Sequence, residues 1–326
     1  MRVPRLSSGG FRRLTTVNLV LLVAIIVSGA VVRLTNSGLG CRDWPNCSAD
    51  QFVNVSTHHA AIEQLNRIFS GAIGLPIALA LIGAYQLRPG RRDLVRLAWI
   101  LFGLFWCEAI LGGISVQVKL AWFSVMSHFL LALALVSIAL RMRQRAYEGE
   151  GQRRPIVPPL ARVAVGVVYL WTIAAVIAGT FVTAAGPHGG DRDARRLTWP
   201  IVDVVRVHGA LVDVLVVLAL LTAWLLARSR APRRVLATAS FALAAMVAQG
   251  VLGYVQYFKA IPAVLVGFHV FGAVMVFAAV QQLEISVRPP APGESGGIAG
   301  SNALLEHSVG PDGSPVASSP VRDPVA

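Results

Sequence analysis

Charged residues are scarce in this sequence. They make up 14% of its 326 residues, whereas 55% are hydrophobic and the mean hydropathy is +0.65. This composition excludes an ordinary soluble domain of this length. Apolar runs of about 20 residues recur along the chain, and each is long enough to cross roughly 30 Å of hydrocarbon. The sequence therefore predicts an all-α integral membrane protein with eight transmembrane helices, at about 14–35, 64–87, 95–118, 121–141, 160–185, 201–227, 233–257 and 262–284.

Acidic residues are also few, because 16 Asp and Glu stand against 29 Lys and Arg, giving a formal net charge of +13. No basic stretch is interleaved with aromatic residues on a soluble domain, so we expect no nucleic-acid partner. The arginines instead cluster at alternate helix ends, within 2–13, 88–96, 141–162 and 228–234, and at 288. By the positive-inside rule both termini are cytoplasmic and four loops lie outside. We expect a multi-pass protein of a bacterial cell membrane.

The two halves of the chain repeat a pattern of glycine and histidine. Leu111-Gly-Gly precedes His128 by 17 residues, and Leu252-Gly-Tyr precedes His269 by the same interval. Residues 28–41 likewise resemble residues 178–191 in their glycine positions. This repeat predicts two tandem four-helix bundles that both begin on the cytoplasmic side. A pseudo-twofold axis along the membrane normal would relate them.

These patterns divide the chain into five segments. The C-terminal segment is rich in Pro, Gly and Ser, which predicts disorder because such a composition buries little apolar surface. The segments are a cytoplasmic N-terminus (1–13), an N-terminal four-helix unit (14–141), a cytoplasmic linker (142–159), a C-terminal four-helix unit (160–284) and a disordered cytoplasmic tail (285–326).

The sequence lacks the closely spaced His, Cys and carboxylate residues that typically hold zinc. Instead, His128, His208 and His269 each fall about seven residues into a separate helix, roughly 10 Å deep. Single imidazoles from facing helices suit axial ligation of haem iron. His208 and His269 form such a pair in the C-terminal unit.

In the N-terminal unit His128 needs a partner on the second helix. His59 lies one helical turn before Glu63, so both can face the same space. Glu63 is either a solvated carboxylate at a helix N-terminus or a functional group beside the metal site. Three further charged residues are open to both a direct role and a helix-packing role: Glu108, Arg206 and Asp213.

There are only three cysteines. Cys107, inside the third helix, is expected to be a packing residue. Cys41 and Cys47 flank a five-residue spacer in the first outer loop, where the compartment permits disulfides. A structural staple, a redox dithiol and a part of a metal site are the alternatives, although the spacing differs from C-x-x-C. We expect a disulfide that orders the approach to the haem site.

Several of these motifs together resemble the haem A synthases, integral membrane enzymes of cytochrome oxidase assembly. They are Gly40-Cys41-Arg-Asp-Trp-Pro-Asn-Cys47, Glu63-x-x-Asn66-Arg67, and Val182-Thr-Ala-Ala-Gly-Pro-His-Gly-Gly-Asp191. The resemblance extends over nearly the whole membrane portion. It implies oxidation of the C8 methyl of haem O to a formyl group, giving haem A. It also implies a resident haem b in the C-terminal unit and substrate haem in the N-terminal unit.

The resemblance also assigns individual residues. It places the C-terminal haem ligands at His208 and His269, the helix-four histidine of the substrate site at His128, and the essential glutamate at Glu63. Many members have Glu-x-x-His-Arg on helix two, where this chain has Asn66. Members resembling the actinobacterial type have a histidine four residues before the glutamate, which is His59 here. We favour His59 as the ligand and Asn66 as a hydrogen-bonding neighbour.

Three other functions fit parts of the pattern. A dihaem b-type cytochrome that passes electrons between quinol and a partner would use the same axial histidines. A prenyltransferase needs paired aspartates on the cytosolic side, whereas Asp191 and Asp193 are predicted outside. A transporter would leave the histidines unexplained. Besides the lipid bilayer, the expected partners are haem O, haem O synthase as a candidate donor, and an electron acceptor that the sequence does not identify.

Overall fold

A computed structural model describes residues 6–148, 151 and 153–290. The eight predicted helices are confirmed, and these residues form no β-strand. Each helix is long and apolar enough to cross a membrane. The helices are α1 (Ser8–Leu34), α2 (His58–Gln86), α3 (Arg92–Gln117), α4 (Trp122–Glu148), α5 (Pro159–Ala185), α6 (Ile201–Arg228), α7 (Arg233–Phe258) and α8 (Ala263–Ser286).

Several helices extend beyond the predicted apolar spans. α2 begins at His58 rather than near residue 64, because the Thr57 side chain caps it by accepting a hydrogen bond from the Ala60 amide. α4 continues past residue 141 to Glu148, so the first part of the predicted linker is helical. Hydropathy marks the part of a helix that fits the hydrocarbon, whereas capping marks its end. Most of the predicted disordered tail, 291–326, lies outside the described residues.

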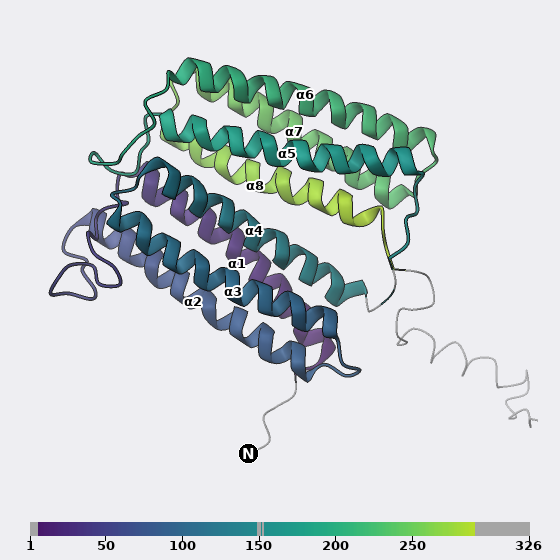
Figure 1. Ribbon diagram of the computed structural model, residues 1–326, viewed down its shortest axis with the longest axis horizontal. Coiled ribbons are helices and arrows are strands. Elements are labelled where there is room, and N and C mark those ends of the chain that lie inside the picture. The colour runs from purple at the N-terminus through teal and green to yellow at the C-terminus, as the bar shows by residue number, and fades with distance from the viewer. Residues whose placement is uncertain (1–5, 149–150, 152, 291–326) are drawn as a thin grey trace, which may run out of the picture.

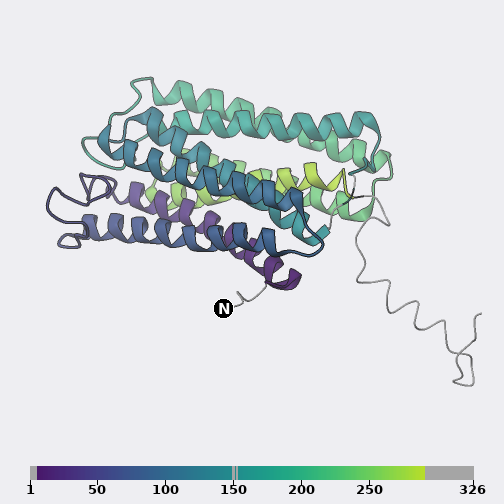
Figure 2. The same cartoon turned by 60° about the horizontal axis from the view of Figure 1, so that its bottom comes forward.

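Figure 1 shows α1 to α4 packed as one group and α5 to α8 as a second group beside it. The view turned by 60° in Figure 2 shows the same long helices running side by side. One apolar core lies among α1 to α4 and includes Leu101 and Val136, with Phe277 of α8 joining it from the other group. A separate core among α5 to α8 includes Val168 and Met246. The pseudo-twofold axis and the orientation of the termini stay predictions.

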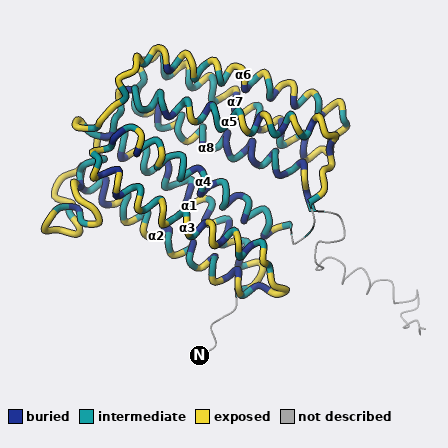
Figure 3. The backbone as a smooth tube through the Cα atoms, viewed as in Figure 1, coloured by how far each residue is buried: buried dark blue, intermediate teal, exposed yellow. Residues whose placement is uncertain are grey.

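Most of the helical surface faces outward. Only 17% to 33% of the most apolar window of each helix is buried inside the protein. Figure 3 shows exposed positions along the outer sides of the helices and in the loop between α1 and α2. Large apolar side chains such as Leu75, Leu170 and Phe268 are among the exposed residues. An apolar surface of this extent requires lipid rather than water as its solvent.

The loops at one end of the bundle join the two helix groups. The Gly38 amide donates to the Gly190 carbonyl at 2.9 Å, and Arg33 Nε donates to the His188 carbonyl at 2.5 Å. Gly190 has a φ of +96°, a conformation that strongly favours glycine. The His188 ring in turn lies 2.9 Å from the carbonyl of Ile261, between α7 and α8. The glycine-rich segment after α5 therefore braces the end of the molecule that holds the candidate site.

Candidate functional site

The loop between α1 and α2 contains the predicted disulfide, which is confirmed between Cys41 and Cys47. Both cysteines are buried and pack against Ala60 at the start of α2. A Cβ at Gly40 would lie 2.5 Å from the His59 carbonyl, so only glycine permits this approach of the loop to α2. Trp44 lies across α3, where a Cβ at Gly113 would meet its ring at 2.5 Å. The disulfide loop thus packs onto α2 and α3 rather than extending into solvent.

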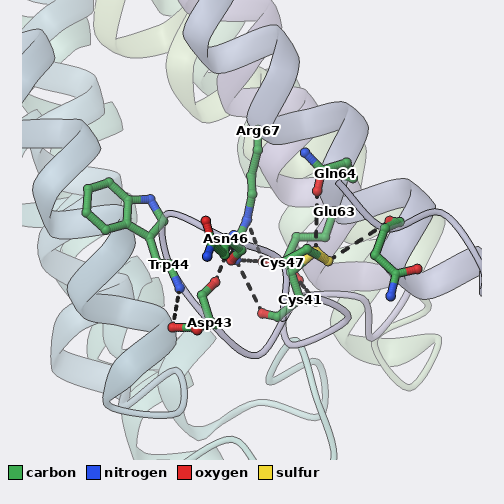
Figure 4. A network of polar contacts seen from close by, with 9 residues as sticks. Cys41, Asp43, Trp44, Asn46, Cys47, Glu63, Gln64 and Arg67 are labelled. Atoms are coloured by element: carbon green, nitrogen blue, oxygen red, sulfur yellow. Dashed lines mark hydrogen bonds and ion pairs between the residues drawn. A yellow bond between two sulfur atoms is a disulfide. The ribbon is translucent and has the colours of Figure 1, made fainter. Parts of the chain in front are cut away.

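Glu63 and Arg67, one turn apart on α2, hold this loop through the network shown in Figure 4. The Glu63 carboxylate accepts hydrogen bonds from the Cys41 amide at 2.7 Å and from Arg67 Nη2 at 2.6 Å. Arg67 also donates to the backbone carbonyls of Asp43, Asn46 and Cys41 at 2.9, 3.1 and 3.2 Å. Glu63 is only 5% exposed, so its charge is compensated by these donors rather than by water.

His208 and His269 face one another from α6 and α8. Their ring centroids are 6.4 Å apart and the rings are nearly perpendicular, at 81°. Two imidazole nitrogens, each about 2 Å from one metal on opposite sides, place the ring centroids roughly 6 Å apart. The pair therefore fits the axial positions of a single haem iron.

The surroundings of these two rings support the same fit. His208 Nδ1 lies 3.0 Å from the Ala175 carbonyl, which orients the ring and leaves its Nε2 available to a metal. Glycines permit both rings to approach the neighbouring helix, because a Cβ at Gly179 or Gly253 would lie 3.1 or 3.2 Å from a ring carbon. His269 Nδ1 is buried and has no hydrogen-bond partner among the described residues.

His128 on α4 occupies a corresponding position in the first helix group. A Cβ at Gly112 would lie 3.2 Å from its ring, the same distance as that between Gly253 and His269. Its Nδ1 lies 3.3 Å from Oε1 of Glu108 on α3, within ion-pair distance but without hydrogen-bond geometry. The second Glu108 oxygen is buried without a partner in the described part of the chain. A buried carboxylate therefore lies directly beside this imidazole.

The α2 side of this site differs from its counterpart on α6. Asn66 is the ninth residue of α2 and His208 the eighth of α6, so the two lie at similar depths. Asn66 Oδ1 is buried and lacks a hydrogen-bond partner among the described residues. His59 is the second residue of α2, about 10 Å nearer the helix start at 1.5 Å per residue. Its Nδ1 lies 3.0 Å from the Ser37 hydroxyl.

The part of the chain that the structure describes contains no group of three or more His, Cys, Asp or Glu side chains that could hold a metal ion. A haem needs only two axial ligands from the protein, because its porphyrin supplies the others. Among the described residues, the paired imidazoles on α6 and α8 are therefore the candidate site whose geometry suits a haem.

Comparison with known proteins shows the family. Residues 12–59 and 50–187 match the COX15-CtaA family, described as a cytochrome oxidase assembly protein. Together these segments span residues 12–187, more than half of the chain. The chain belongs to this family. The predicted membership of the haem A synthase family is thereby confirmed, and with the eight helices it makes the chain a multi-pass membrane protein.

Curated relatives agree with this assignment at modest identity. The "Heme A synthase" of Shewanella oneidensis is 29% identical over 176 residues, covering 48% of this chain and 52% of the relative. That of Exiguobacterium sibiricum is 25% identical over 167 residues, covering 51% and 56%. The chain thus aligns with about half the length of these relatives.

The family match covers only part of the candidate site. It includes the disulfide loop, Glu63 and His128, whereas His208 and His269 lie beyond residue 187. For those two histidines the support is their geometry and the internal repeat. COX15-CtaA membership and ring geometry are therefore independent observations on the two halves of the molecule.

Other predicted residues lie away from these sites. Arg206 is 77% exposed in its side chain and pairs loosely with Asp203 at 3.9 Å. Asp213 accepts a hydrogen bond from the Tyr254 hydroxyl at 3.3 Å between α6 and α7. The packing role predicted for Cys107 is wrong, because this cysteine is exposed on α3. An apolar run does not by itself reveal which helix face turns outward.

Sequence reasoning missed Arg67 as a site residue. Its spacing of four residues from Glu63 was a usable signal, because i,i+4 pairs of opposite charge face each other on a helix. Its three carbonyl partners were not predictable, since they depend on the fold of residues 41–46.

Proposed function

We propose that this protein is a haem A synthase that oxidises the C8 methyl group of haem O to a formyl group, giving haem A. The observation that carries the proposal is a difference between two corresponding sites. One offers two facing imidazoles, and the other offers a single imidazole, seven residues into its helix as His269 is, beside the carboxyl group of Glu108. Family membership and relatives named heme A synthase support the same conclusion.

The site on α6 and α8 suits a resident haem b. When bound, that haem would supply an electron relay between the substrate and an external acceptor. His208 and His269 would hold it, and two imidazole ligands would favour its retention. The Ala175 carbonyl fixes the ring orientation of His208.

The site beside α2, α3 and α4 suits haem O as the substrate. We assign His128 as its ligand, with Glu108 against the ligand's Nδ1. Asn66 on α2 is at a helix depth similar to that of His208 on α6, and an amide is a weaker iron ligand than an imidazole. One strong ligand is suited to a molecule that must enter and leave. We place His59 at the mouth of this site, where its ring lies one turn before Glu63.

Glu63 is proposed to handle protons at the reacting methyl group. Its carboxylate also accepts hydrogen bonds from the Cys41 amide and the Arg67 guanidinium. Glu63 therefore connects the disulfide loop to α2. This position would let the disulfide loop exclude water while haem O is bound. We place the sites near the outer face of a bacterial cell membrane, with both termini cytoplasmic and lipid around the helices.

Haem extraction from cells tests the function. The full chain would be expressed in a strain that lacks its own haem A synthase but makes haem O, and extracted haems would be identified by mass. We expect haem A from the parent and none from a His128→Ala variant that still reaches the membrane. Haem O without haem A in the parent, together with an intact bis-histidine spectrum, would instead indicate a dihaem b-type cytochrome.

A further inference from the structure

A cavity of about 590 Å³ lies at the end of the molecule opposite to the histidine sites. It is lined mainly by the first residues of α3, the last residues of α4 and the end of α8. Both helix groups therefore contribute to it. In Figure 1 the corresponding ends of α4 and α8 diverge at the right. Nothing in the proposed oxidation chemistry requires this cavity.

Arginine dominates the wall of the cavity. Five guanidinium groups line it, from Arg96, Arg141, Arg145, Arg153 and Arg288. Only two carboxylates, those of Asp93 and Glu284, line it as well. Five positive charges against two negative charges leave an excess of three positive charges. A partly enclosed space with this excess attracts anions.

The carboxylates do not neutralise every guanidinium. Glu284 pairs with Arg141 at 3.3 Å, and Asp93 lies 3.9 Å from Arg145. The guanidinium groups of Arg96 and Arg288 have neither an ion pair nor a hydrogen bond within the described ranges. Two arginines that line the cavity, one on α3 and one just after α8, are therefore available to an incoming anion.

Apolar side chains line the cavity as well. Leu97 and Ile100 follow Arg96 on α3, so they lie up to one turn, about 6 Å, farther from the helix end. Ile285 faces the same space from α8. Ile100 is 37% exposed, so this apolar wall continues onto the outer surface of the bundle. The arginines suit a phosphate group, and the neighbouring apolar side chains suit an acyl chain attached to it.

We propose that this cavity binds the phosphodiester headgroup of an anionic phospholipid, with Arg96 and Arg288 as its principal phosphate contacts. The acyl chains would lie along Leu97 and Ile100. Clusters of arginine at the membrane surface attract anionic lipid in this way. The lipid would bridge α3 and α8, and hence the two helix groups, at the end of the molecule where Arg141 and Glu284 also join them.

Native mass spectrometry of the purified full-length protein tests the proposal. After delipidation, phosphatidylglycerol or the zwitterionic phosphatidylcholine would be added back and the bound lipid quantified. We expect preference for phosphatidylglycerol, weakened about tenfold in an Arg96→Gln/Arg288→Gln double variant. An Arg233→Gln variant is the matched control, because Arg233 is an exposed arginine at the start of α7, at the same end of the molecule, and does not line the cavity.

A variant that is expected to strengthen lipid binding distinguishes the proposal from simple misfolding. Glu284→Gln removes a competing carboxylate and frees Arg141, so it should bind phosphatidylglycerol several-fold more tightly. Inorganic phosphate should compete only weakly, because it lacks the acyl chain. Equal binding of the two lipids, an equal loss in Arg233→Gln, or inorganic phosphate binding as tightly as the lipid would each overturn the proposal.

Discussion

The contact between Glu63 and Arg67 makes the stability of the disulfide loop measurable. Replacing either residue by glutamine leaves the other charge largely buried, since their side chains are 6% and 17% exposed. Removing one partner of a buried ion pair costs about 3 to 5 kcal/mol. We expect about 3 kcal/mol in each single variant, because one uncharged hydrogen bond can persist and Arg67 retains its carbonyl partners.

The two substitutions should not be additive. Once Glu63 is glutamine, replacing Arg67 removes a charge that has already lost its partner. We therefore expect the double variant to cost about 2 to 3 kcal/mol less than the sum of the single variants. Additive losses would show that the two side chains stabilise the loop independently, contrary to the network in Figure 4.

Hydrogen exchange of residues 37–47, followed by mass spectrometry, measures this loop directly. The Cys41 amide donates to Glu63, so its protection reports the contact. A loss of 3 kcal/mol should accelerate exchange about a hundredfold, because each 1.4 kcal/mol is a factor of ten. Unchanged exchange in both single variants would refute the reasoning.

The same pair of variants separates a structural role of Glu63 from a catalytic one. Both should open the loop to a similar extent, but only Glu63→Gln removes the carboxylate. If Glu63 handles protons, haem A yield should fall further in Glu63→Gln than in Arg67→Gln at matched protein levels. Equal yields in the two variants would assign Glu63 to loop attachment alone.

Three further predictions address the histidine sites. His208→Ala should abolish the bis-histidine absorption spectrum of the purified protein, whereas His128→Ala should preserve it; the reverse pattern would contradict the assignment of the resident haem. Asn66→His should raise the haem retained per polypeptide by adding an imidazole at the depth of His208, and an unchanged haem content would show that position 66 does not face the site. Gly179→Ala places a Cβ 3.1 Å from the His208 ring and should shift the haem spectrum or lower haem content, whereas Gly166→Ala on the same helix meets open space and should do neither.

The transmembrane helices were predictable because each depends on one continuous stretch of the sequence. A run of about 20 apolar residues must cross the bilayer as a helix, since backbone groups in hydrocarbon need internal hydrogen bonds. The start of α2 was placed wrongly because the residues before the apolar run are polar, yet Thr57 caps a helix that already includes His59. A search for capping residues ahead of each apolar run would have found it.

The candidate site was predictable only where the sequence repeats or pairs. The disulfide followed from two cysteines in one outer loop, and the facing imidazoles followed from histidines at one depth on two helices of the second half. The brace through Gly190 and His188 was not predictable, because its hydrogen bonds are accepted by backbone carbonyls of a segment about 150 residues away. Backbone partners leave no pattern in side-chain sequence.

The glycines beneath the histidines show what distinguishes the two sites. A Cβ added at Gly112 or Gly253 would lie 3.2 Å from the ring of His128 or His269, the same distance in both helix groups. The packing on this side is therefore equivalent in both sites. The helices differ at this depth, because α6 carries His208 where α2 carries Asn66. Under the proposed function, this change of one residue would let one site retain its haem while the other releases it.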